Sequence, residues 1–166
     1  MQKFIGRRKY VNACDMKDEY INLAKNDEKS ASILQEHYLY NEAVYMYIQA
    51  MEKKIKGYIC GKVDASNPYF SQKLREVGHS LDLSIDFLIE ILAGNDEMLK
   101  IQLSKQLKEY VFENILFSKL HNDSRYPKYN IHEKKYFILD ITEQDCVRIR
   151  NINDKLDRFI CDFDRL

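Results

Sequence analysis

The chain has 166 residues with 26 basic and 26 acidic side chains, so its formal net charge at pH 7 is zero. This length suits one domain with a full hydrophobic core, and 45% hydrophobic with 31% charged residues is the composition of an ordinary soluble globule. The balanced charge argues against constitutive, sequence-independent duplex binding, which usually requires a basic surplus. No apolar run of about 18 residues is present, so we expect no membrane span.

The first 14 residues form a basic leader containing Arg7, Arg8 and Lys9. They lack the apolar core of a secretory signal. Two interpretations stay open: a partly ordered tail of the kind common at chain termini, or an electrostatic arm. Residues 15–166 are expected to form a single helical domain.

Four cysteines are spread along the chain and form no CxxC pair; they are Cys14, Cys60, Cys146 and Cys161. A zinc site needs closely spaced ligand pairs, so we expect neither a metal nor a cofactor. Free cysteines usually behave as small buried hydrophobic residues in a reducing compartment. We therefore expect a cytoplasmic location for this protein.

Two consecutive helices are expected first, over residues 15–36 and 38–60. The short connection between them predicts antiparallel packing. In the second helix, residues spaced at i, i+4, i+7, i+8, i+11 and i+15 form one stripe that should face a core: Ala43, Tyr47, Ala50, Met51, Lys54 and Tyr58. Its other side carries polar residues, and Lys53, Lys54 and Lys56 are read most simply as a solvated face.

Three further helices follow. Residues 62–78 are read as a polar connection with a turn at Asn67-Pro68, after which Ser80 should cap a helix over residues 81–93. Apolar periodicity predicts another helix over residues 98–120. After a loop over residues 121–141, Thr142 should open the last helix with a capping box. The sequence thus predicts five helices and one structured loop.

Three blocks of the chain resemble the HEPN domain (higher eukaryotes and prokaryotes nucleotide-binding domain). The second helix is similar to a family pattern at Ala43, Gln49, Ala50, Glu52, Lys53 and Lys56. Gly78-His79-Ser80-Leu81 resembles the Gly-His-Asp-Leu block that begins the third helix, and Arg125-Tyr126-Pro127 resembles an Arg-Tyr-Pro block before the final helix.

The resemblance implies an all-α, up-and-down four-helix bundle, here with an additional helix and a structured loop before the last helix. It also implies a homodimer and one of several roles. Many family members are metal-independent ribonucleases of toxin–antitoxin or antiphage systems that use an Arg-x(4–6)-His motif. Others lack the motif and serve as partners of minimal nucleotidyltransferases or as interaction modules.

Arg125 and His132 are the first candidates for catalysis because six residues separate them, which is within the family spacing. A histidine can take a proton near neutral pH, and the planar guanidinium can grip a phosphate. Against this assignment, Pro127 bars a regular helix across the pair, and the trailing His-x-Tyr of the active motif is missing. Arg125 could instead fix the loop to the bundle.

His79 is the backup catalytic candidate; Arg75 precedes it, but the three residues between them are one fewer than the family spacing requires. The simpler interpretation is that His79 helps to order the start of the third helix. The loop after residue 120 interleaves cations with aromatic residues, which can hold phosphates and stack bases. The candidate nucleotide- or RNA-binding residues are Arg125, Tyr126, Lys128, Lys134 and Lys135, with Tyr129 and Tyr136 nearby.

The favoured hypothesis is a HEPN-type module that binds a nucleotide or RNA or mediates an interaction, and that is paired with a nucleotidyltransferase. This hypothesis favours a binding protein over an enzyme. A second hypothesis is a metal-independent endoribonuclease toxin that uses Arg125 and His132. A third is a helical scaffold that only dimerises or binds a protein.

Overall fold

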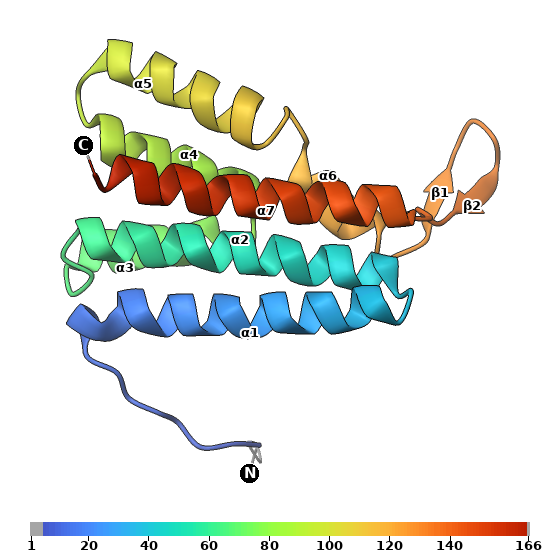
Figure 1. Ribbon diagram of the computed structural model, residues 1–166, viewed down its shortest axis with the longest axis horizontal. Coiled ribbons are helices and arrows are strands. Elements are labelled where there is room, and N and C mark those ends of the chain that lie inside the picture. Colours follow the sequence, from blue (N-terminus) through green and yellow to red (C-terminus); the bar gives the residue numbers. More distant parts are fainter. Residues whose placement is uncertain (1–4, 166) are drawn as a thin grey trace.

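The computed structural model describes residues 5–165, which are predominantly helical (Figure 1). The all-α prediction is confirmed at this level. The helices are α1 (Met16–Glu36), α2 (Tyr40–Lys62), α3 (Pro68–Val77), α4 (Leu81–Ala93), α5 (Glu97–Ser104), α6 (Phe117–Asp123) and α7 (Glu143–Phe163). Within residues 5–165, none of them combines the length and apolarity that a bilayer crossing needs.

Helix α2 occupies the middle of the molecule. Helices α1, α4 and α7 all pack against it, and α1 and α7 run alongside it in Figure 1. The predicted stripe is confirmed, because Ala43, Ala50 and Met51 are fully buried and Tyr47 and Tyr58 are nearly so. Burying this apolar face is what makes such a helix stable.

Helix α1 approaches α2 closely at Gly57. A Cβ added at Gly57 would lie 3.1 Å from the Lys17 carbonyl oxygen and 3.1 Å from the Tyr20 Cβ. The glycine, expected to cost helix stability, therefore permits the contact between the two helices. The helix continues through Gly61, and α2 ends at Lys62.

A helix not predicted from the sequence, α3, occupies Pro68–Val77. Asn67 caps it, its side chain accepting a hydrogen bond from the Tyr69 amide at 2.9 Å, and Pro68 takes the first helical position. The Asn-Pro pair therefore begins a helix here, although it was read only as a turn. Proline is well suited to that position because the amide it lacks would have no partner there.

The helix expected over residues 98–120 is divided. Helix α5 continues into η2, a π-helix at Lys105–Val111, and the chain then breaks before α6. Glu113 and Asn114 have φ angles of 54° and 55°, a left-handed conformation that a helix cannot continue through. The buried Leu103 and Leu107 preserve the apolar period that suggested one helix.

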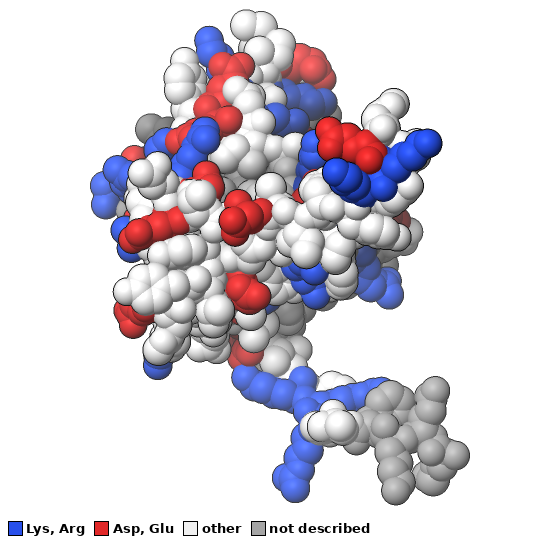
Figure 2. Space-filling model, turned by 90° about the vertical axis from the view of Figure 1, so that its right-hand side faces the viewer, with Lys and Arg blue, Asp and Glu red and all other residues white. Residues whose placement is uncertain are grey.

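The loop before the last helix contains a small antiparallel hairpin, β1 (Lys128–Asn130) and β2 (Lys135–Phe137). It projects from one end of the helical body in Figure 1. Thr142 then caps α7 through the predicted capping box with Asp145. At the other terminus, the backbone of residues 5–12 extends away from the helices and leads into η1 (Ala13–Asp15), while the Lys9 side chain pairs with Glu19 on α1 (Figures 1 and 2).

Candidate functional site

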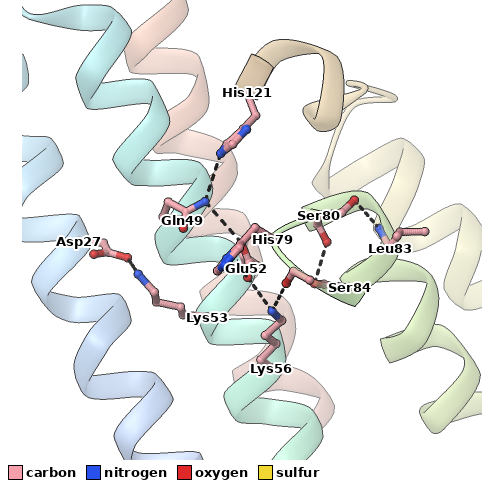
Figure 3. A network of polar contacts seen from close by, with 11 residues as sticks. Asp27, Gln49, Glu52, Lys53, Lys56, His79, Ser80, Leu83, Ser84 and His121 are labelled. Carbon is pink, nitrogen blue, oxygen red and sulfur yellow. Dashed lines mark hydrogen bonds and ion pairs between the residues drawn. The ribbon is translucent and has the colours of Figure 1, made fainter. Parts of the chain in front are cut away.

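A buried row of polar side chains runs along α2 (Figure 3). Gln49, Glu52 and Lys56 are each less than 10% exposed. The Lys56 Nζ lies 2.7 Å from Glu52 Oε1 and also donates to the Gly78 carbonyl oxygen. The Gln49 amide donates to Glu52 Oε2 at 3.4 Å. A carboxylate and an ammonium can be buried at such positions because each neutralises the other.

The solvated lysine face predicted on α2 is wrong for two of its three residues. Lys56 is buried beside Glu52, and Lys54 is buried on another side of the helix, where its Nζ lies 2.6 Å from Asp157 and 3.0 Å from Asn153. Lys53 is half-buried and pairs with Asp27. The acidic partners of Lys53 and Lys54 lie on α1 and α7, where the pattern within α2 could not indicate them, whereas Glu52, the partner of Lys56, lies four residues before it on α2 itself.

His79 lies where the α3–α4 turn meets the buried row. The turn contains Gly78 with φ of 58°, and the Ser80 hydroxyl accepts a hydrogen bond from the Leu83 amide as the cap of α4, as expected. The His79 Nδ1 lies 3.6 Å from Glu52 Oε1, while its side chain is 83% exposed. His79 is therefore open to solvent and next to a buried carboxylate.

His121 on α6 meets the same row at Gln49, about one helical turn of α2 before Glu52, which His79 meets (Figure 3). The Gln49 amide donates to its Nε2 at 3.4 Å, and its ring lies 4.9 Å from the Tyr45 ring. Burial lowers the pKa of His121, and the positive charge of Arg125 adds to that decrease. His121 is consequently neutral at pH 7, in agreement with a ring nitrogen that accepts from an amide.

Arg125 lies against two aromatic faces just beyond α6. Its guanidinium carbon is 4.5 Å from the centre of the Tyr45 ring and 5.1 Å from that of Tyr126. Arg125 itself is exposed and borders a pocket of about 220 Å³ with Asn41, Glu42, Tyr45 and Ser124. Stacking holds the guanidinium plane while leaving its N–H edges free to bind an anion.

The position of α6 is fixed by a residue on α4. The Asp82 carboxylate accepts hydrogen bonds from the Phe117 amide at 3.1 Å and the Ser118 amide at 2.7 Å, which are first-turn donors with no partner inside α6. Phe117 is fully buried against Phe112. This cap places His121 and Arg125, four residues apart, over Tyr45.

Asn41, at the start of α2, joins the two ends of the hairpin segment. Its side-chain amide donates to the carbonyl oxygens of Ser124 at 3.1 Å and Leu139 at 2.8 Å, and its oxygen accepts from the Ile141 amide at 3.0 Å. Residues 125–138 therefore leave and rejoin the helical body at a single side chain. The hairpin is held at its base by Asn41, and Lys128 at the start of β1 adds an ion pair with Asp123 at the end of α6.

The hairpin carries exposed aromatic and basic side chains. Tyr129 opposes Tyr136 across the strands, with ring centres 5.1 Å apart, and both are more than half exposed. Lys128 pairs with Asp123. Lys134, in the turn, and Lys135 are exposed, and within residues 5–165 neither makes an ion pair. Figure 2 looks onto this end, where basic and acidic patches lie among uncharged surface.

The structure brings some of the candidate residues together and separates others. Arg125 contacts Tyr126, and Lys134 and Lys135 share the hairpin. His132 lies exposed in the hairpin turn, its amide donating to Asn130 Oδ1 at 3.0 Å. Across residues 5–165, no hydrogen bond, ion pair or ring contact joins His132 to Arg125.

Sequence reasoning missed the histidine that does lie beside Arg125. His121 shares the Tyr45 ring with Arg125 and reaches the buried row through Gln49. Two signals could have indicated this: the i, i+4 spacing of His121 and Arg125, and the helical spacing of Asn41, Tyr45, Gln49, Glu52 and Lys56 along α2.

The cysteines and metal-ligand residues offer no further site within the described part of the chain. Cys60 and Cys146 are buried as expected, whereas Cys14 and Cys161 are exposed, so the expectation of buried thiols holds for only two of the four; all four are free. Residues 5–165 contain no group of three His, Cys, Asp or Glu side chains arranged to hold a metal ion.

No family model, curated protein or solved structure matches this chain.

Proposed function

We propose that the chain is a HEPN-type module that binds RNA or a nucleotide through Arg125 and the adjoining hairpin. In this proposal it acts in the cytoplasm as a homodimer, in a toxin–antitoxin or phage-defence type of system with a nucleotidyltransferase as partner. The packing of α1, α4 and α7 around α2, with a hairpin before the last helix, is compatible with the expected four-helix bundle with a structured loop.

The observation that carries the proposal is the placement of Arg125 between Tyr45 and Tyr126 (4.5 and 5.1 Å from their ring centres) with its side chain exposed. Tyr126 and the Tyr129–Tyr136 pair are accessible for base stacking, which contributes about 1–3 kcal/mol per base. A bound phosphate would meet the guanidinium edge, and Lys134 and Lys135 would supply further positive charge.

Equilibrium binding tests the proposal. Fluorescence anisotropy of a labelled single-stranded RNA and of a labelled adenine nucleotide would be measured near physiological salt for wild type and Arg125→Ala. We expect roughly tenfold to hundredfold weaker binding on loss of the stacked cation. Arg158→Ala is the matched control, because Arg158 is an exposed arginine on α7 that, among residues 5–165, hydrogen bonds only within its own helix, to the Asp154 carbonyl oxygen.

Two results would reject the proposal. One is wild-type protein without measurable affinity for either probe. The other is an equal loss of affinity in Arg125→Ala and Arg158→Ala, which would reflect net charge alone. Binding of a nucleotide without RNA, or the reverse, would identify the ligand class.

A metal-independent endoribonuclease is the second candidate, and it is favoured by the shared contact of His121 and Arg125 with Tyr45. A neutral histidine can accept the proton of a ribose 2′-hydroxyl, which His121 does only after its Nε2 gives up the hydrogen bond from Gln49, and an arginine can stabilise the phosphorane. His79, near Glu52, would be available to protonate the leaving 5′-oxygen. The products would be a 2′,3′-cyclic phosphate and a 5′-hydroxyl.

A cleavage assay with total RNA and tRNA in EDTA separates the candidates. If this second candidate is right, His121→Ala and Arg125→Ala abolish cleavage, His79→Ala reduces it, and the exposed His132→Ala leaves it intact. Loss of cleavage in His132→Ala would instead support the pairing suggested by sequence spacing. Absence of cleavage by wild type would leave the binding module in place.

A further inference from the structure

Helix α5 presents an outward face with two large exposed apolar side chains. Its inner side is fixed by Leu103, which is 1% exposed, and by the fully buried Leu107 of η2, which follows α5. Met98 is 77% exposed and Ile101 is 63% exposed. At 100° per residue, Ile101 points away from the direction of Leu103, so it marks the middle of the outer face. In Figure 1, α5 lies at the outer edge of the molecule, over α4.

The same face carries opposite charges at equal spacing on either side of Ile101. Glu97, the first residue of α5, lies four residues before it, and Lys105, the first residue of η2, lies four residues after it; both are exposed. Together with Lys100, Ser104 and Glu109, these residues line a shallow groove of about 460 Å³ along the helix. In residues 5–165, Glu97 meets only Lys100, at 4.0 Å, and Lys105 makes no ion pair.

This arrangement is self-complementary. A two-fold axis through Ile101 would place α5 antiparallel to α5 of a second copy and would set each Glu97 opposite the partner's Lys105. Isologous dimers require such a surface, on which one patch fits itself. The two Ile101 side chains would meet on the axis, and the Met98 side chains would flank them, removing apolar surface from water.

We propose that the outer face of α5 is the docking surface for a second copy of this chain, paired antiparallel through Ile101 and the reciprocal Glu97–Lys105 contacts. The inference rests on the homodimer proposed above and adds its interface. One short helix buries less than the roughly 1,600 Å² of a standard interface. The dimer should therefore be weak and concentration-dependent, with a dissociation constant in the micromolar range.

Charge exchange provides the test. Sedimentation velocity over a concentration series would compare wild type with Glu97→Lys and Lys105→Glu. Each single substitution sets like charges opposite one another twice, so we expect at least a tenfold weaker dimer, the change that about 1.4 kcal/mol produces. The double variant Glu97→Lys/Lys105→Glu should regain wild-type association, since the opposing charges are restored with their signs exchanged.

Mixing the two single variants gives a second readout. In a mixed dimer every contact joins opposite charges, so an equimolar mixture should associate more tightly than either variant alone. Far-UV circular dichroism would check that all variants fold. A monomeric wild type would overturn the proposal, as would a dimer that neither single substitution weakens or a double variant that fails to recover.

Failure here can be told apart from failure of the proposed function. RNA binding is assigned to Arg125 and the hairpin, which α5 does not contain. Anisotropy on the Glu97→Lys variant should report retained RNA binding even where the dimer is lost. Loss of dimerisation with retained binding therefore tests the interface alone.

Discussion

The buried row of α2 and the hairpin carry the same kinds of side chain in opposite environments. In the row, Lys56 is 5% exposed and pairs with a buried carboxylate. In the hairpin, Lys134 and Lys135 are exposed and, within residues 5–165, have no acidic partner. Positive charge in the first region is already neutralised and contributes to the fold, whereas in the second it is available to a ligand.

His121 and Arg125 lie between these regions. His121 belongs with the side chains that support the fold, and Arg125 with those that are available to a ligand. His121 reaches inward to Gln49, while Arg125 lies outward over Tyr45 and Tyr126. Substitutions in the row should therefore change stability first, and substitutions in the hairpin should change binding first.

The largest effect is expected from Glu52→Ala. This change leaves Lys56 as a buried charge without its carboxylate, and breaking a buried pair on one side typically costs about 3–5 kcal/mol. Urea unfolding followed by circular dichroism would measure the loss. Glu133→Ala, an acidic residue of the exposed hairpin turn, is the matched control and should change the free energy of unfolding by less than about 0.5 kcal/mol. Equal effects at the two sites would contradict the comparison.

Asn41→Ala should have an intermediate effect, because Asn41 connects the two regions. It removes three hydrogen bonds, to Ser124, Leu139 and Ile141, and exposes their backbone groups to water near the surface. We expect about 1–3 kcal/mol of destabilisation. Hydrogen exchange should accelerate in residues 124–141 while the amides in the middle of α2 stay protected. Faster exchange spread evenly over the chain would show that Asn41 supports the whole fold instead.

The smallest effect concerns pH. Because the pKa of His121 is lowered in the folded state, the unfolded chain takes up this proton first as the pH falls below about 6.5. His121 therefore adds nothing to the pH dependence above that value and makes stability decline below it. Urea unfolding at pH 7.5 and 5.5 should show a smaller decline for His121→Gln than for wild type. An identical decline in both proteins would contradict a neutral, partly buried His121.

Much of the helical framework could be predicted because its signals are local. The stripe of Ala43, Ala50 and Met51 follows the helical period. Ser80 and Thr142 are residue types that commonly cap helices, and they do cap α4 and α7. The break after η2 has no glycine or proline to mark it, since Glu113 and Asn114 supply the left-handed turn. The Phe117 end of α6 depends on Asp82, which lies 35 residues away in sequence.

The candidate site was less accessible to sequence reasoning because its contacts join distant segments. Arg125 and Tyr126 could be selected as an Arg-Tyr pair beside lysines. Spacing along the chain led to His132, whereas the residue that folds against Tyr45 with Arg125 is His121. The burial of Glu52 and Lys56 likewise depends on the α3–α4 turn at Gly78, which the composition of α2 does not reveal.

The most direct test of the hairpin as a ligand surface is RNA affinity as a function of salt for two matched double variants. Lys134→Glu/Lys135→Glu alters the hairpin, and Lys25→Glu/Lys29→Glu makes the same change of charge on the exposed side of α1. We expect both to unfold like wild type. Only the hairpin variant should bind RNA more weakly and lose about 1.4 from the slope of log affinity against log salt, the contribution of two phosphate contacts to a single strand. Equal losses in both variants, or no loss in either, would contradict the assignment of RNA binding to the hairpin.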